Sequence, residues 1–157
     1  MRALSRCLAL TIAANFIAIL GGCAQVDSPN YEKVLPSDYR NAFVQVRGCR
    51  ASIDHDLAYV IVRTRPEMAS VYDSGPYPFP SGTLVVKEQY RDSSCQDLSG
   101  YTAMRKEGSG YFPAGADWQW YTLDTLERVV QNGKVERCAG CHRQQCGDKR
   151  DRMCTEP

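Results

Sequence analysis

The hydrophobic and polar positions along the chain divide its middle into strand-like stretches. Four such stretches are predicted to be β-strands, and the first is rich in β-branched and aromatic residues, a composition typical of strands. They cover residues 57–64, 83–90, 100–107 and 117–123. The last three follow one another with only turn-rich segments between them, which favours an antiparallel meander.

Other stretches show helical spacing. A helix is predicted over 37–48, where Ser37 can cap the N-terminus and apolar residues recur every three to four positions. A second helix is predicted over 64–75, with Thr64 as its N-cap and Gly75 as its end.

A third helix is predicted over 124–133, since Asp124 or Thr125 can cap it and Gly133 can end it. Together these elements predict an α+β fold, a small antiparallel β-sheet with a few packing helices.

The first residues have the features of an export signal. Arg2 and Arg6 precede an uncharged apolar run over 8–20, which is shorter than the roughly 20 residues of a transmembrane helix. The sequence "LGGC" then resembles a bacterial lipobox, which predicts lipidation of Cys23. The alternative is an ordinary signal peptide cleaved after Ala24.

These features predict three segments: a lipoprotein signal peptide over 1–22, a tether over 23–36 and one domain over 37–157. The expected location is the periplasmic side of a bacterial membrane, lipid-anchored, or the soluble periplasm if the lipobox is not used. The precursor has a formal net charge of only +1. Nucleic acid is therefore not expected as a partner.

Eight cysteines suit an oxidising compartment better than the cytosol. Four of them lie outside the leader, the lipobox and the motif near the C-terminus. Three pairings of these four are open. We favour Cys49–Cys95 and Cys146–Cys154, because the second pair would close a short loop directly after that motif.

The motif is "CAGCH", residues 138–142. On a helix, Cys138 and Cys141 lie on one face, and His142 follows directly. C-x-x-C-H is the attachment motif of c-type haem, in which two thioethers hold the macrocycle and the histidine is the proximal iron ligand. Haem attachment takes place outside the cytoplasm, in agreement with the leader. One covalent haem c is therefore the expected cofactor.

Two other sites use the same residues. Four thiolates, from Cys138, Cys141, Cys146 and Cys154, would make a closed zinc site in a zinc- or disulfide-stabilised binding domain. Two facts argue against zinc: exported thiols tend to be oxidised, and the sequence lacks the second C-x-x-C that is typical of a zinc ribbon. A thioredoxin-like dithiol would need the motif at a helix start within a βαβ unit.

A sixth iron ligand would make the protein a six-coordinate electron-transfer cytochrome. The candidates are His55 and three methionines, Met68, Met104 and Met153. Met153 lies within the segment that the second predicted disulfide would close, whereas Met104 suits a strand core.

The stretch "FPSGTLVVKEQY" contains one unusual lysine. Strand alternation places Lys87 on the same face as Thr83 and Val85, and both faces are largely apolar. On spacing alone, the simplest explanation is an edge strand with a solvated lysine.

The order of "FPSGTLVVKEQY", "YTAMRKEGSGYFPAGADWQWYTL" and "CAGCH" resembles the cytochrome P460 family of small bacterial haem proteins, from about Ser37 to His142. The resemblance implies a compact antiparallel sheet with helices around one haem, as in the related cytochrome c′-beta. It also implies that Lys87 lies against the haem, since founding members cross-link a lysine of this strand to the haem edge.

Founding members oxidise hydroxylamine and handle nitric oxide. Their distal carboxylate would align near Thr102 and an arginine of their first strand near Ala58, so this chain departs from the family at both positions. The resemblance implies binding or oxidation of small nitrogen species at an open distal site, with a periplasmic electron acceptor or donor as partner. A homodimer is compatible with the sequence.

Overall fold

The computed structural model describes residues 33–52 and 58–154. The predicted signal peptide, the predicted lipidation site Cys23 and the candidate ligand His55 lie outside these residues, as does most of the predicted tether.

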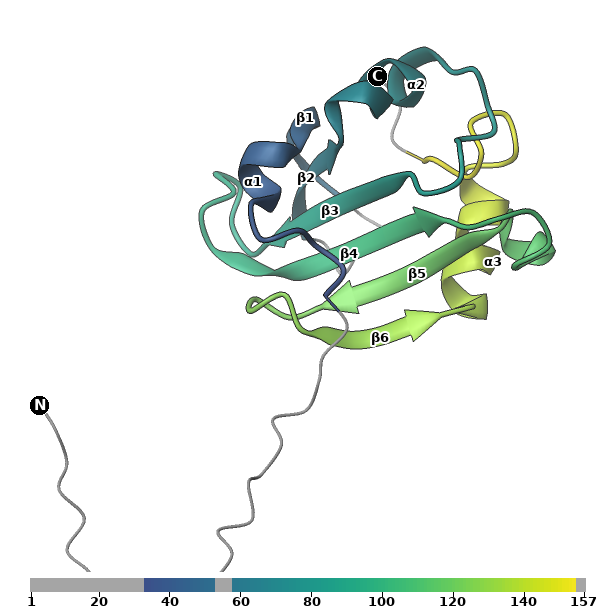
Figure 1. The fold of residues 1–157 in the computed structure, drawn as a ribbon. Helices are drawn as coiled ribbons and strands as arrows, with labels where there is room; N and C mark the ends of the chain where they lie inside the picture. The colour runs from purple at the N-terminus through teal and green to yellow at the C-terminus, as the bar shows by residue number, and fades with distance from the viewer. Residues whose placement is uncertain (1–32, 53–57, 155–157) are drawn as a thin grey trace, which may run out of the picture. The chain divides into compact units, whose positions relative to one another are not determined.

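The fold is built on a six-stranded sheet in which each strand pairs with its neighbours in the sequence (Figure 1). All five pairings are antiparallel. The four predicted strands are confirmed, and two more flank them. The strands are β1 (Val44–Ala51), β2 (Tyr59–Thr64), β3 (Leu84–Tyr90), β4 (Leu98–Lys106), β5 (Trp118–Leu123) and β6 (Val129–Gly133).

A few short helices accompany the sheet, which confirms the α+β class. They are α1 (Tyr39–Ala42), the 3₁₀ turn η1 (Pro66–Met68), α2 (Ala69–Ser74), the 3₁₀ turn η2 (Pro113–Gly115) and α3 (Glu136–Gln145). Within residues 33–52 and 58–154, no helix is long and apolar enough to span a membrane.

The helix predicted over 37–48 is mostly wrong. It is limited to the single turn α1, whose N-cap Asp38 makes no side-chain cap hydrogen bond. At Phe43 the backbone becomes extended, with φ −114° and ψ 136°, and β1 begins. Pairing with β2 satisfies the backbone hydrogen-bonding groups of this stretch. It therefore forms an edge strand, although its apolar residues have helical spacing.

The helix predicted over 124–133 is also wrong. Asp124 does accept hydrogen bonds from following backbone N–H groups, at Leu126 (2.9 Å) and Arg128 (3.0 Å). These bonds close a turn instead of starting a helix, since Glu127 has a φ of 61°. The chain then reverses and β6 pairs with β5.

The second predicted helix exists with a different start. The hydroxyl of Thr64 donates to the Leu84 carbonyl (2.9 Å), so Thr64 bridges to β3 and Arg65 takes the N-cap position of η1. The predicted end is confirmed, because Gly75 follows α2 with a φ of 81°.

Each face of the sheet carries its own core. On one face, side chains of the central strands pack with α1 and the residues before it: Leu35, Tyr39, Phe43, Leu84, Val86, Tyr101, Ala103, Tyr121 and Leu123. On the other face, the strands pack with α3 and the loops around it: Val62, Tyr72, Phe79, Val85, Met104, Phe112, Trp118, Trp120, Ala139 and Met153.

Both predicted disulfides are confirmed, Cys49–Cys95 and Cys146–Cys154. Cys138 and Cys141 are free thiols. The zinc alternative is therefore wrong in its four-thiolate form, because two of the four sulfurs are bonded to each other.

Candidate functional site

The C-x-x-C-H motif lies on α3, the longest helix in the described chain. Ala139, between the two cysteines, is 2% exposed and packs into the core. Cys138 is half-buried and Cys141 is exposed. The burial of Ala139 thus fixes how α3 is rotated about its axis. In this orientation Cys138, Cys141 and His142 line the space between the helix and the sheet.

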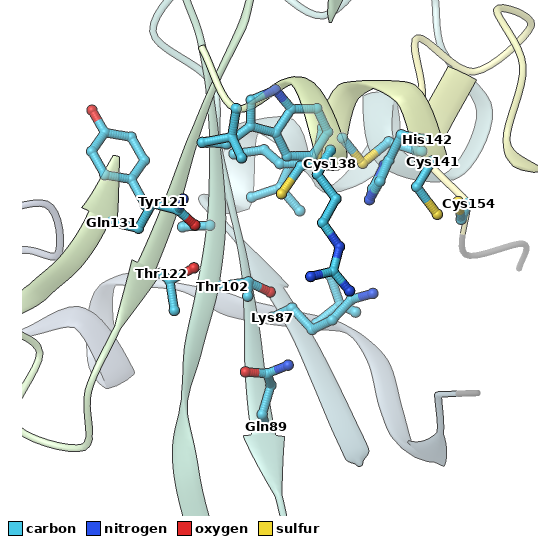
Figure 2. Close-up of a pocket in the computed structure, with 18 of the residues that line it drawn as sticks. Lys87, Gln89, Thr102, Tyr121, Thr122, Gln131, Cys138, Cys141, His142 and Cys154 are labelled. Carbon is cyan, nitrogen blue, oxygen red and sulfur yellow. The ribbon is translucent and has the colours of Figure 1, made fainter. Parts of the chain in front are cut away.

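A cavity of about 430 Å³ lies between α3 and the sheet. All three motif residues line it, and so does Lys87 of β3. Figure 2 shows Cys138, Cys141 and His142 extending from the helix, while Lys87 and Thr102 extend from the strands on the opposite side of the space. The structure therefore brings together the sequence-predicted cofactor residues, and Lys87 lines this cavity rather than a separate solvated edge.

Strand register builds a polar row across the cavity side of the sheet. Lys87 pairs with Thr102, Thr102 with Thr122, and Thr122 with Gln131. Directly paired residues point to the same face, so these four side chains lie side by side across four strands. All four line the cavity.

The imidazole of His142 is held in one tautomer. Its Nδ1 lies 2.8 Å from the backbone carbonyl oxygen of Arg152. A carbonyl oxygen only accepts, so Nδ1 carries the proton, and in the neutral ring the lone pair is on Nε2. This is the form in which a histidine ligates a metal through Nε2. The ring also stands edge-on to Trp120, with centroids 4.6 Å apart.

The environment of the first cysteine favours the neutral thiol. Burial raises the pKa of Cys138 above its usual range, while the charge of Arg137 acts in the opposite direction. Arg137 lines the cavity as well. The protein environment of Cys138 therefore favours its neutral thiol form.

The residues fit a haem on three observations. The cavity volume falls in the range of cofactor pockets, roughly 300–1,000 Å³. His142 has the tautomer that an axial ligand needs. The buried indole Nε1 of Trp120, at the cavity wall, has no hydrogen-bond partner in the described part of the chain. Such an orphaned donor is typical of a site built around a further group.

The candidate sixth ligands are separated by the structure. Met104 and Met153 line the cavity, and both are largely buried. Met68 does not line it; its Sδ accepts a hydrogen bond from Thr83 (3.3 Å). Thr102 occupies the cavity wall, whereas Ala58 precedes β2 and is not among the lining residues.

Several lining residues were missed by the sequence analysis: Tyr72, Gln89, Thr122, Gln131, Val135 and Arg137. Strand alternation from Lys87 identifies Gln89 as a neighbour on the same face. Gln131 was hidden by the wrong helix over 124–133. The Arg152 carbonyl has no sequence signal, since every residue has one.

The sequence was compared with curated proteins and with models of protein families. A search of curated proteins finds no match to the chain. The family model described as Cytochrome P460 matches residues 36–152, which include the whole sheet, the Lys87 strand and the C-x-x-C-H helix. A haem cofactor is what this family implies. The chain is thus a member of the cytochrome P460 family.

Proposed function

We propose that the protein is an exported mono-haem c-type cytochrome that binds small nitrogen species at an open distal site. The observation that carries this proposal is the convergence of Cys138, Cys141, His142 and Lys87 on one cavity.

Attachment would use the two free thiols. Each S–H, of Cys138 and of Cys141, would add across one vinyl group and form a thioether. Both cysteines lie on one turn of α3, so a single macrocycle can take both bonds.

His142 would be the proximal ligand through Nε2, with its other nitrogen fixed by the Arg152 carbonyl. A bound haem would supply an iron that takes a small nitrogen species as ligand and exchanges single electrons with a partner. The polar row Lys87, Thr102, Thr122 and Gln131 would face such a ligand with hydroxyl, amide and amine groups.

The cavity favours ligand binding over hydroxylamine oxidation. Oxidation of hydroxylamine needs a group that takes up protons. No aspartate or glutamate is found among the described residues that line the cavity, and Thr102 is not a base at neutral pH. Nitric oxide binding needs no such group.

A second candidate, an electron carrier, is favoured by Met104 and Met153. Both line the cavity, so a thioether could cap the iron and give a six-coordinate centre. Exposure to nitric oxide separates the two functions: an open site binds the gas readily, and a capped site resists it.

Export and a lipid at Cys23 are part of the proposal. The leader "MRALSRCLALTIAANFIAILGGC" and the two disulfides support an oxidising compartment. Metabolic labelling with a fatty acid should mark the mature protein and leave a Cys23→Ser variant unlabelled. Labelling of that variant would contradict lipidation at this residue.

The first experiment is expression with the c-type haem maturation machinery, followed by mass spectrometry under denaturing conditions. We expect the mass to rise by that of one haem. The Cys138→Ser/Cys141→Ser double variant should lose the covalent haem, and the matched Cys49→Ser/Cys95→Ser variant should keep it. A wild-type protein without haem would overturn the proposal.

Optical spectra of the same samples address Lys87 and the iron. A strongly red-shifted Soret band that disappears in Lys87→Met would support a lysine–haem cross-link. An ordinary five-coordinate spectrum that changes with nitric oxide would support a gas-binding site without one. Sharp low-spin bands, lost in Met104→Ala or Met153→Ala, would support the electron carrier.

A further inference from the structure

The carbonyl that receives the His142 hydrogen bond belongs to a strained turn. The Met153 N–H donates to the Arg150 carbonyl (3.0 Å), and the two central residues are Asp151 (φ 49°) and Arg152 (φ 72°). Two consecutive positive φ values are those of a type I′ turn, which favours Gly, Asn and Asp. A left-handed backbone is unfavourable for arginine, because its Cβ then lies too close to the following carbonyl oxygen. Strain of this kind persists only where the surroundings impose it.

Buried polar contacts impose it here. Asp151 is 6% exposed, and its carboxylate forms an ion pair with the Lys106 Nζ (2.7 Å). The same carboxylate accepts a hydrogen bond from the Phe79 N–H (2.9 Å). Its carbonyl accepts the indole N–H of Trp118 (2.9 Å). Three segments distant in the sequence therefore hold one residue of the turn, directly before Arg152.

The Cys146–Cys154 disulfide closes the same segment from its two ends. One ligand atom each of His142, Cys146 and Cys154 lie within 4.8 Å of one another. Because the two sulfurs are bonded together, this cluster is no metal site. It places the disulfide beside the imidazole that the turn contacts.

We propose that the Arg150–Met153 turn, held by the Lys106–Asp151 ion pair and the Cys146–Cys154 disulfide, is a positioning device that sets the electron-donor strength of His142. A fixed Nδ1–H···O=C bond makes the imidazole more basic, which stabilises the oxidised metal and lowers its reduction potential. Arg152 is then a positioning residue that acts through its backbone. This inference rests on the proposed function, since it takes His142 as the axial ligand.

The test compares two substitutions of Arg152 in the haem-loaded chain. Arg152→Asn and Arg152→Val both remove the guanidinium and its ion pair with Asp148 (2.8 Å). Asparagine tolerates positive φ, whereas a β-branched residue there is an outlier. We expect the Val variant to favour the reduced state by about tenfold, which is about 59 mV for a one-electron couple. The Asn variant should stay near the wild type.

Resonance Raman gives a second readout on the same samples. The iron–histidine stretch should fall in frequency for Arg152→Val, because a less basic imidazole binds more weakly, and should hold for Arg152→Asn. If the role of the turn were purely structural, both variants would change in unfolding. Their reduction potential and their iron–histidine stretching frequency would then stay at the wild-type values.

The disulfide supplies an independent variant in case Arg152→Val does not fold. Cys146→Ser/Cys154→Ser should raise the reduction potential, whereas Cys49→Ser/Cys95→Ser, which removes the other disulfide, should not. Equal potentials in all variants that carry His-ligated haem would overturn this inference and leave the proposed function intact. A wild-type chain without covalent haem would instead overturn the proposed function.

Discussion

Glu88 is fully buried on the sheet face opposite the cavity, next to Lys87 in sequence. Its carboxylate accepts a hydrogen bond from the Tyr90 hydroxyl (2.9 Å) and forms an ion pair with Arg63 Nε (3.2 Å). Neighbouring residues in a strand point to opposite faces, so a shift of one position would exchange Glu88 and Lys87. The buried carboxylate thus secures the register that places Lys87 in the cavity.

Replacement of Glu88 by Gln removes the charge and leaves Arg63 with an unmatched, mostly buried guanidinium. We expect the free energy of unfolding to fall by about 3–5 kcal/mol, the cost of breaking a buried pair. Chemical denaturation measures this change. The exposed Glu67, replaced by Gln, is the control and should stay within about 0.5 kcal/mol of the wild type. A small loss in Glu88→Gln would mean that the pair does not hold the register.

Asp92 carries an acid-sensitive contribution to stability. Hydrogen bonds from the Ser94 hydroxyl and from backbone N–H groups, including that of Asp97, lower the pKa of Asp92 from an ordinary 3.8 to about 2. A carboxyl group with a lowered pKa in the folded state stabilises above its unfolded pKa, and this contribution is lost as the pH falls through about 4 to about 2.

Unfolding of the wild type and of Asp92→Asn should therefore be compared at pH 7 and at pH 2. The variant should be less stable at pH 7, and the difference between the two proteins should be much smaller at pH 2. A constant difference between them at both pH values would contradict this assignment.

At the scale of elements, the sequence predicts the central strands and fails at the edges. Strands β2 to β5 carry β-branched and aromatic residues that pack on both faces, and their pattern is visible in the sequence. The edge strands β1 and β6 have mostly exposed residues, so little burial marks their period. Their extended form depends on a partner strand that local sequence does not reveal.

The candidate site shows the same division. The cysteines and His142 were found because their residue types carry chemistry at a recognisable spacing. Lys87 was found through the resemblance to the cytochrome P460 family, since its spacing alone predicted a solvated edge lysine. The polar row of Thr102, Thr122 and Gln131 depends on register across four strands, and register is a property of pairing. The hydrogen bond that fixes His142 depends on the backbone conformation of a turn, for which the sequence "KRDRM" gives no signal.

The position of α3 depends on a close contact with η2. Gly115 is buried there, and a Cβ added to it would lie 2.5 Å from the Phe112 ring and 3.2 Å from the Ala139 Cβ. We expect Gly115→Ala to push α3 outward, with a loss of about 1–3 kcal/mol in unfolding free energy. It should also lower the yield of covalent haem.

Gly108→Ala is the matched control, because a Cβ there meets nothing within 4 Å. Thermal unfolding and the haem mass per chain should both be unaffected in this control. An unchanged haem yield in Gly115→Ala would show that the motif does not need this contact.

At the scale of the whole molecule, the two disulfides differ in reach. Cys49–Cys95 joins residues 46 apart, and Cys146–Cys154 joins residues 8 apart. The entropy of the closed loop predicts about 4 kcal/mol for the first and about 2.5 kcal/mol for the second. Double serine variants, unfolded with denaturant, should reproduce this order. The reverse order would mean that local packing around the short loop outweighs loop entropy.

The meander order of the sheet has a consequence for the time course of biosynthesis. Every strand pairs with the strand made just before it, so each hairpin can form as soon as its second strand is available. The cysteines of α3 are synthesised after all six strands. Covalent modification of the motif is then expected as the last event of maturation, on a chain whose sheet already exists. A chain that ends at residue 133 should still form the Cys49–Cys95 bond, which thiol alkylation detects. If that bond does not form, the sheet needs α3 in order to fold.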